Sequence, residues 1–329
     1  MRKLFSALIA TSLLMTVNLS YANEKPGEGI EVLPLHSTIS EEAFQTMVLN
    51  EALRQLGYDV KEIKQVDYST AYTAISNGDA TFMPVNWFPL HNSMYANAGG
   101  DDVFYRGGAY IEGAVQGYLI DKKTADKYNI TSIDQFKDAK IAKLFDTNND
   151  GTADLTGCQA GWGCEGVIEH QLDTFKLRDR INHNQGQYAA IIADTIVRYN
   201  EGQSIFYYTW TPYWVSGKLV PGKDVVWLEV PYSANPNGTD TALPNGKNYG
   251  FEINSQRIVA NKEFASNNPA AAKLFEVAKL PINDVSAENM LIADGEDSQQ
   301  QIRQHALNWI KMNQVAFNGW LTAARNAAE

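Results

Sequence analysis

Three short segments place tryptophan beside glycine, proline and polar residues instead of in an apolar stripe. In Thr156–Cys164 (TGCQAGWGC), Trp162 lies between two glycines inside a loop that the only two cysteines of the chain can close. The other two segments are Asn86–His91 (NWFPLH) and Tyr207–Trp214 (YYTWTPYW). Tryptophan faces attract cations, and glycine leaves neighbouring backbone N–H groups accessible. The three segments therefore predict the walls of a pocket for a small organic cation.

The first residues of the chain have the pattern of a secretory signal peptide. Met1–Lys3 gives a charged start, Leu4–Val17 is mainly apolar, and a small-x-small ending follows at Ala22. The apolar stretch is shorter than the roughly 20 residues that span a bilayer, and no later stretch is apolar enough to do so. We expect a signal peptide at residues 1–22, cleaved after Ala22, and a periplasmic mature chain.

The two cysteines have two alternative interpretations. In an exported chain, Cys158 and Cys164 favour a disulfide, which would fix the loop around Trp162 and contribute about 2–3 kcal/mol. The alternative is a nucleophilic cysteine paired with His91 or His170, and this requires a free thiol. No serine elbow, zinc-protease motif or phosphate loop accompanies the cysteines. We therefore expect no catalytic residues.

Charge and length restrict the class of protein further. The formal net charge is −11 at pH 7, and removal of Arg2 and Lys3 with the signal peptide makes it more negative still. Because nucleic acid binds basic surfaces, this charge excludes nucleic acid as a partner. A chain of 329 residues buries a sizeable core, and above about 250 residues a chain commonly divides into two lobes.

Strand and helix patterns alternate along the chain. A strand predicted at Gly29–Leu35 precedes a helix that begins after Ser40, its predicted N-cap, and ends at Leu56. A later strand, Asp79–Trp87, leads directly into the loop that carries His91. Ligands of α/β sheets bind beyond the carboxyl ends of the strands, so this placement favours a site there.

The alternation predicts an α/β protein of two lobes, each a mostly parallel sheet flanked by helices, with a cleft between them. We expect residues 23–113 and 231–329 to form the first lobe and residues 114–230 the second. A helix predicted at Cys164–Phe175 follows the tryptophan loop, and the amphipathic stretch Gln299–Ala324 completes the first lobe.

Beyond the aromatic segments, the whole chain closely resembles one family, the periplasmic glycine betaine/proline betaine-binding proteins of osmoprotectant ABC importers. The matching pieces extend over most of the sequence, which makes the resemblance more specific than any short motif. They are Val85–His91, Gln116–Asp126, Lys143–Asn148, Thr156–Gly166, His183–Gly186 and Phe206–Trp214.

The resemblance implies a two-lobe periplasmic binding protein of the type II-like kind, with glycine betaine or proline betaine as ligand. It implies that Trp87, Trp162 and Trp210 enclose the trimethylammonium group. It also implies that the backbone N–H groups of Gly163 and Cys164, together with the His91 side chain, hold the carboxylate. The partners implied are permease subunits at the inner membrane, and we expect a monomer without cofactors.

The residue types suit this ligand, although other small solutes stay open. A quaternary ammonium has no N–H to donate, so aromatic faces hold it where hydrogen bonds do not. Gly163 and Cys164 lie at the predicted start of a helix, where free N–H groups favour an anion. Choline, a carbohydrate or a plain amino acid is the alternative ligand, and the sequence does not settle the protonation state of His91.

The remaining tryptophans and histidines have a simpler interpretation. Large aromatic residues are commonly buried for packing, and unpaired histidines without ligand spacing are a weak signal. We therefore assign structural or surface roles to Trp214, Trp227, Trp309 and Trp320, and to His36, His170, His183 and His305.

One acidic segment resembles the opening of a calcium loop, with oxygen donors on alternate residues and a glycine at the bend. The candidate ligands are Asp146, Asn148, Asp150 and Asp154. The twelfth position is Gly157 where calcium loops have a bidentate glutamate, so the pattern is incomplete. A turn rich in Asp and Asn without a metal is the favoured interpretation.

Overall fold

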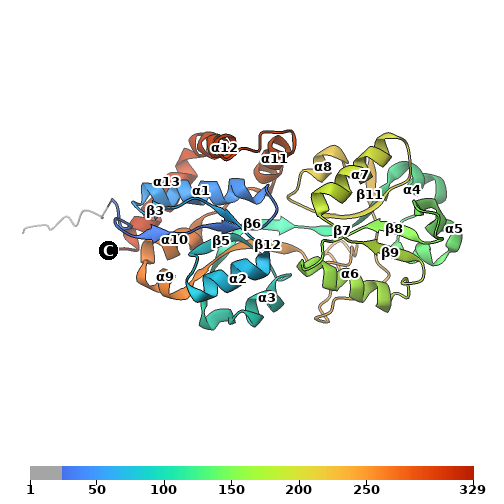
Figure 1. Cartoon of the computed structure of the whole chain (residues 1–329), viewed down its shortest axis with the longest axis horizontal. Helices are drawn as coiled ribbons and strands as arrows, with labels where there is room; N and C mark the ends of the chain where they lie inside the picture. Colours follow the sequence, from blue (N-terminus) through green and yellow to red (C-terminus); the bar gives the residue numbers. More distant parts are fainter. Residues whose placement is uncertain (1–23) are drawn as a thin grey trace, which may run out of the picture.

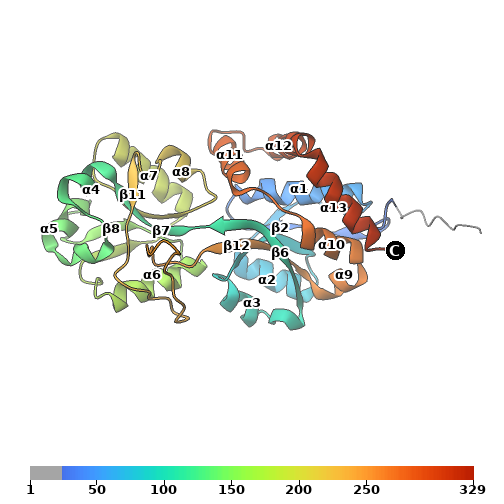
Figure 2. The same cartoon turned by 180° about the vertical axis from the view of Figure 1, so that it is seen from behind.

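The computed structural model describes residues 24–329, and the predicted signal peptide lies outside them. The described chain forms two lobes arranged end to end along the long axis of the molecule (Figure 1, Figure 2). Strands β6 (Phe104–Ala114) and β7 (Gln116–Asp121) run one after the other from the first lobe into the second. The predicted two-lobe α/β fold is confirmed.

The first lobe is built on a three-stranded sheet. Its order is β5 (Phe82–Phe88), β12 (Asn254–Asn261), β6, and both pairings are antiparallel. Two short parallel pairs accompany it, β1 (Glu31–Val32) with β3 (Asp59–Val60) and β2 (Leu35–His36) with β4 (Lys64–Gln65). The helices of this lobe come from both ends of the described chain: α1 (Glu42–Gln55), α2 (Tyr68–Asn77), α3 (Asn92–Asn97), η1 (Gly100–Asp102), α9 (Lys262–Asn267), α10 (Pro269–Val277), α11 (Ile282–Ala293), α12 (Gln299–Met312) and α13 (Gln314–Asn326).

The second lobe contains a five-stranded mixed sheet. Its order is β11 (Val225–Trp227), β7, β10 (Phe206–Trp210), β8 (Ala153–Thr156), β9 (Ile181–Asn184). Strand β8 is parallel to β10 and β9, whereas β7 is antiparallel to β10 and β11. The helices around it are α4 (Lys122–Tyr128), η2 (Ile133–Lys137), α5 (Ala139–Ala142), η3 (Lys143–Phe145), α6 (Gly163–Thr174), α7 (Tyr188–Asn200) and α8 (Val215–Lys218).

The prediction of mostly parallel sheets is right only in part, because the three-stranded sheet of the first lobe is antiparallel and the sheet of the second lobe is mixed. Strand β6 carries the chain out of the first lobe, and β12 carries it back in. Because these two passages run in opposite directions side by side, they pair antiparallel. The alternation of strands and helices along the sequence does not reveal this reversal.

The return to the first lobe occurs late in a long irregular segment. Between β11 and β12, residues 228–253 form no helix. Near the end of the segment, the Gln171 Nε2 group on α6 donates to the Gly250 carbonyl (2.5 Å). The segment therefore contacts the second lobe near its end, and the boundary that we expected at residue 231 lies upstream of this contact.

Two helix ends differ from the predicted ones. The N-cap of α1 is Glu41 instead of Ser40. The Ser40 hydroxyl donates to the Glu41 carboxylate (3.3 Å) and caps no helix N–H. The predicted helix Gln299–Ala324 is two helices, because Asn313 leaves the helical conformation between α12 and α13. Trp309 and Trp320 face each other across this break, with ring centroids 5.9 Å apart. Both rings are buried, which confirms their packing role.

Strand β6 was not predicted, because Gly107 and Gly108 break its hydrophobic pattern. These glycines allow α10 to pack closely on the strand. A Cβ on Gly107 would lie 2.3 Å from the Phe275 carbonyl oxygen, and one on Gly108 would lie 2.5 Å from that of Glu276. The residues that weaken the strand signal are thus the ones that the packing requires.

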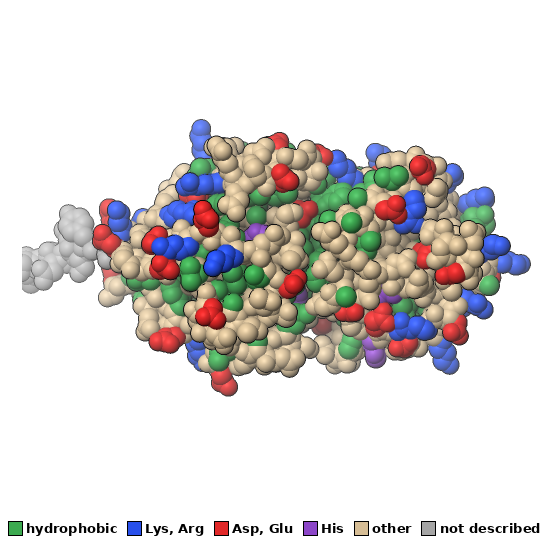
Figure 3. Space-filling view, viewed as in Figure 1, with side chains coloured by type: hydrophobic (Ala, Val, Ile, Leu, Met, Phe, Trp, Pro, Cys, Tyr) green, Lys and Arg blue, Asp and Glu red, His purple; other side chains and the backbone are tan. Residues whose placement is uncertain are grey.

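Within residues 24–329, none of the helices combines the length and apolar character needed to span a bilayer. On the face drawn in Figure 3, acidic and basic side chains are interspersed over both lobes, and the lobes are in contact.

Candidate functional site

A cavity lies where the two lobes meet. All six residues that the sequence singled out line it, namely Trp87, His91, Trp162, Gly163, Cys164 and Trp210. The first two come from the first lobe and the other four from the second. Segments far apart in the sequence therefore converge on one cavity.

The aromatic walls are held by their neighbours. Trp162 and Trp210 meet edge to face, with ring centroids 5.5 Å apart and planes at 80°. Behind Trp210, the Tyr213 ring stacks at 4.4 Å and the Tyr188 ring lies at 4.7 Å. Trp210 is 4% exposed, whereas Trp162 is half-buried. These contacts fix the face that Trp210 presents to the cavity.

Trp87, on β5 of the first lobe, is anchored within its own lobe by a buried hydrogen-bond chain. Its indole Nε1 donates to Tyr68 Oη (3.1 Å), and Tyr68 Oη donates to Glu42 Oε1 (2.5 Å). Burial raises the pKa of Glu42 from 4.5 to about 7, and the hydrogen bond from Tyr68 opposes this rise. The chain fixes the orientation of Trp87 and places an ionisable group behind the aromatic wall.

Helix α6 begins at the cavity. The N–H groups of Gly163 and Cys164 lie in its first turn, where no carbonyl of the helix can accept from them. Neither N–H donates to another acceptor among the described residues. The helix start therefore offers two free donors and the positive end of the helix dipole to an anion. A Cβ on Gly163 would lie 2.9 Å from Leu90 Cγ, so only glycine allows this approach of the lobes.

His91 faces the helix start from the first lobe. Its backbone N–H donates to the Trp87 carbonyl (2.6 Å), which closes a turn directly after β5. The side chain is 1% exposed, and burial lowers the pKa of His91 from 6.5 to about 3. The imidazole is thus neutral at physiological pH and acts as a hydrogen-bonding group, not as a charge.

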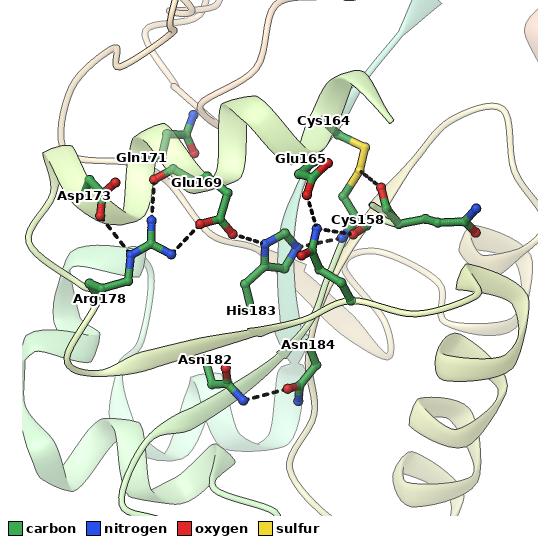
Figure 4. Close-up of polar contacts among 12 residues, drawn as sticks. Cys158, Cys164, Glu165, Glu169, Gln171, Asp173, Arg178, Asn182, His183 and Asn184 are labelled. Carbon is green, nitrogen blue, oxygen red and sulfur yellow. Dashed lines mark hydrogen bonds and ion pairs between the residues drawn. A yellow bond between two sulfur atoms is a disulfide. The ribbon is translucent and has the colours of Figure 1, made fainter. Parts of the chain in front are cut away.

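The predicted disulfide between Cys158 and Cys164 is present, and His183 supports the loop that it closes. The Cys158 N–H donates to His183 Nε2 (3.0 Å), and His183 Nδ1 donates to Glu169 Oε1 on α6 (2.6 Å) (Figure 4). A Cβ on Gly157 would lie 1.9 Å from the His183 ring. The histidine therefore joins the start of the loop to the helix that ends it.

Sequence reasoning missed five further lining residues: Ile39, Tyr68, Leu90, Gln116 and Tyr208. Leu90 and Tyr208 lie inside the aromatic segments that drew attention, so proximity in sequence could have suggested them. Tyr68 and Ile39 carry no local signal, because only the packing of α2 and the loop before α1 brings them to the site.

The acidic loop satisfies its carboxylates internally. The Asp146 carboxylate accepts from the N–H groups of Asn149, Asp150 and Gly151, and Asp154 Oδ2 accepts from the Thr147 N–H (2.8 Å) and hydroxyl (2.6 Å). Within residues 24–329, no group of three His, Cys, Asp or Glu side chains is arranged to hold a metal ion.

The cavity as a whole is neutral. None of the described residues that line it is Asp, Glu, Lys or Arg, and His91 is uncharged. Aromatic faces and free N–H donors nevertheless occur together within it. This combination suits a small molecule that carries a diffuse positive charge and a compact negative one.

A neutral cavity between two α/β lobes is the arrangement found in solute-binding proteins of the two-lobe periplasmic class. Residues 35–312 match a family model described as the substrate binding domain of ABC-type glycine betaine transport systems. The chain belongs to that family, as the resemblance of its sequence indicated.

Two relatives match over nearly their full lengths. The glycine betaine-binding periplasmic protein OusX of Dickeya dadantii (strain 3937) is 58% identical over 100% of both chains. The glycine betaine/proline betaine-binding periplasmic protein of Escherichia coli (strain K12) is 56% identical over 97% of this chain and 98% of its own. Among solved structures, lactococcal OpuAC in its closed-liganded conformation with glycine betaine has a TM-score of 0.68 at 22% identity, covering 89% of this chain and 99% of that one. At that identity the structural likeness shows the fold.

Proposed function

We propose that this protein is the periplasmic receptor for glycine betaine and proline betaine of an ABC importer. The observation that carries the proposal is the convergence of Trp87, Trp162 and Trp210 with the free N–H groups of α6 in one neutral cavity. The names of the close relatives support the same ligand.

The three indole faces would enclose the trimethylammonium group. Each cation–π contact contributes about 2 kcal/mol or more in a desolvated site, so three faces supply several kcal/mol. The carboxylate would accept from the N–H groups of Gly163 and Cys164 and from the His91 ring. A carbohydrate needs many hydroxyl-matching side chains, and a plain ammonium needs a carboxylate; the cavity wall provides neither in the described chain.

Ligand bridging the lobes would stabilise the closed state and signal occupancy to the permease. In this proposal the receptor works as a monomer, is exported with cleavage after Ala22, and has no catalytic activity, since its cysteines are joined in a disulfide. We place the first lobe before residue 114 and from about residue 252 onward, and the second lobe between them. We propose that Asp146–Asp154 acts as a metal-free turn, and calorimetric titration of chelator-treated protein with calcium tests this by the absence of heat.

Isothermal titration with glycine betaine, proline betaine and choline tests the ligand assignment. Both betaines are expected to bind, and Trp162→Ala is expected to weaken their binding by about 1–2 kcal/mol or more, or roughly 5- to 30-fold. Trp227→Ala is the matched control, because Trp227 is also half-buried but lies outside the cavity. No heat with either betaine, or equal effects of the two substitutions, would refute the proposal.

A further inference from the structure

A buried chain of hydrogen bonds approaches His91 from the side away from the cavity. Asn86, on β5, donates from Nδ2 to Tyr72 Oη (2.6 Å), and Tyr72 Oη lies 3.3 Å from His91 Nδ1. Asn86 is 0% exposed and Tyr72 is 1% exposed, so water does not compete for these groups. Neither residue lines the cavity.

The opposite edge of the His91 ring faces the start of α6. A Cβ on Gly163 would lie 3.4 Å from His91 Cδ2, the ring carbon bonded to Nε2. Nδ1 and Nε2 therefore have different surroundings, with Nδ1 against Tyr72 and Nε2 toward the free N–H groups of α6. A betaine carboxylate bound at α6 would meet Nε2.

In one direction of this chain, Tyr72 donates its proton to His91 Nδ1. Burial raises the pKa of Tyr72 well above its ordinary value, so the hydroxyl keeps its proton. Because Tyr72 Oη already accepts from Asn86, its own proton is free to be donated to His91 Nδ1. A neutral imidazole carries one proton, and acceptance at Nδ1 leaves that proton on Nε2. The ring then presents an N–H donor to the cavity.

We infer that Tyr72 and Asn86 are positioning residues that hold His91 in the tautomer with the proton on Nε2, so that the ring donates to the carboxylate of the ligand. The inference rests on the proposed function and deepens it, since it assigns the residues that make the His91 ring a donor to the carboxylate. Without this relay, an unprotonated Nε2 would direct a lone pair at the carboxylate.

Nitrogen-15 NMR of the full mature protein tests the tautomer, with the His91 signals assigned by comparison with His91→Gln. In the wild type, with and without glycine betaine, we expect an unprotonated Nδ1 and a protonated Nε2. A proton on Nδ1 in either state would overturn the inference. The tautomer can be read from the NMR signals without ligand. A wild-type protein that binds no betaine would therefore refute the proposed function without deciding the tautomer.

Two substitutions test the relay itself. Tyr72→Phe removes the donor to Nδ1 and is expected to weaken glycine betaine binding by up to about tenfold. Choline, which lacks the carboxylate, is expected to keep its affinity. Tyr95→Phe is the matched control, because the Tyr95 hydroxyl donates to Asp101 (2.6 Å) and does not contact His91. Equal effects on both ligands, or equal effects of the two substitutions, would contradict the inference.

Asn86→Asp gives an independent pH profile. When ionised, the new carboxylate accepts from Tyr72, which reverses the chain and moves the His91 proton to Nδ1. We expect glycine betaine binding to weaken by about 10- to 100-fold as pH rises through the pKa of this aspartate, with the NMR signals exchanging in parallel. A variant whose pH profile and His91 signals match those of the wild type would overturn the proposed relay.

Discussion

Gly163→Ala adds one methyl group at the point where the lobes are closest. In the structure, the new Cβ would lie 2.9 Å from Leu90 Cγ, 3.2 Å from the Leu90 carbonyl oxygen and 3.4 Å from His91 Cδ2. The first two contacts are shorter than carbon side chains normally tolerate. Because Leu90 and His91 belong to the other lobe, the methyl would obstruct closure and leave each lobe intact.

The cost can be estimated from overpacking in protein cores, which is typically 1–3 kcal/mol. At about 1.4 kcal/mol per factor of ten, the dissociation constant for glycine betaine should rise by roughly 5- to 150-fold. The backbone N–H of residue 163 is retained in the variant, so the loss would not come from a missing donor. Alanine also has a higher helix propensity than glycine, so the melting temperature of the unliganded variant should be no lower than that of the wild type.

Calorimetric titration with glycine betaine, paired with the melting temperature of the unliganded protein, measures both effects. Gly166→Ala is the matched control on the same helix, because nothing lies within 4 Å of a Cβ at Gly166. If Gly163→Ala binds betaine as tightly as Gly166→Ala and the wild type, the lobes do not approach each other as closely as this reasoning requires.

Three further predictions concern the disulfide and the buried ionisable groups. Reduction of the Cys158–Cys164 disulfide should lower stability by about 2–3 kcal/mol and weaken betaine binding. Thermal melts and titrations with and without reductant measure both effects. Unchanged values would show that the loop is rigid without the bond. The raised pKa of Glu42, about 7 against 4.5, means that the folded state binds the extra proton, so this group's contribution to stability falls as pH rises from about 4.5 to 7. Between pH 5 and 8, the free energy of unfolding of Glu42→Gln should therefore fall by roughly 2–3 kcal/mol less than that of the wild type. Equal falls for the two proteins, measured by denaturation, would contradict a buried carboxylate. The pKa of His91 is lowered to about 3 from 6.5, so this group's contribution to stability falls as pH decreases below 6.5. On acidification from pH 6.5 to 5, His91→Gln should therefore lose about 2 kcal/mol less stability than the wild type. Equal losses would place the imidazole in contact with water.

Local patterns predicted the elements that carry their own start and stop signals. The helix predicted to end at Leu56 is α1, which ends at Gln55, and the helix predicted at Cys164–Phe175 is α6 (Gly163–Thr174). The direction of strand pairing was not predictable in the same way, because it depends on which strands pass between the lobes. Strand β6 was missed because Gly107 and Gly108 have low strand propensity and are needed for close packing against α10.

The site was predictable where its chemistry is concentrated in short segments. Trp162 and its flanking glycines signal a binding loop by residue type alone, and resemblance to the family linked it to Trp87 and Trp210. The supporting residues carry no such signal. Tyr68 lies at the start of an ordinary amphipathic helix, and His183 has no metal-ligand spacing, so only the folded structure shows what each one holds in place.

The absence of formal charge from the described wall of the cavity has a consequence for the conditions under which the receptor works. Dissolved ions weaken attraction between exposed charges over a Debye length, about 8 Å at physiological ionic strength and 3 Å at 1 M. Ring faces and amide dipoles that touch a bound zwitterion directly leave mobile ions little room between them and the ligand. Capture of the ligand should therefore persist in concentrated brine, the medium in which a cell most needs to import a compatible solute.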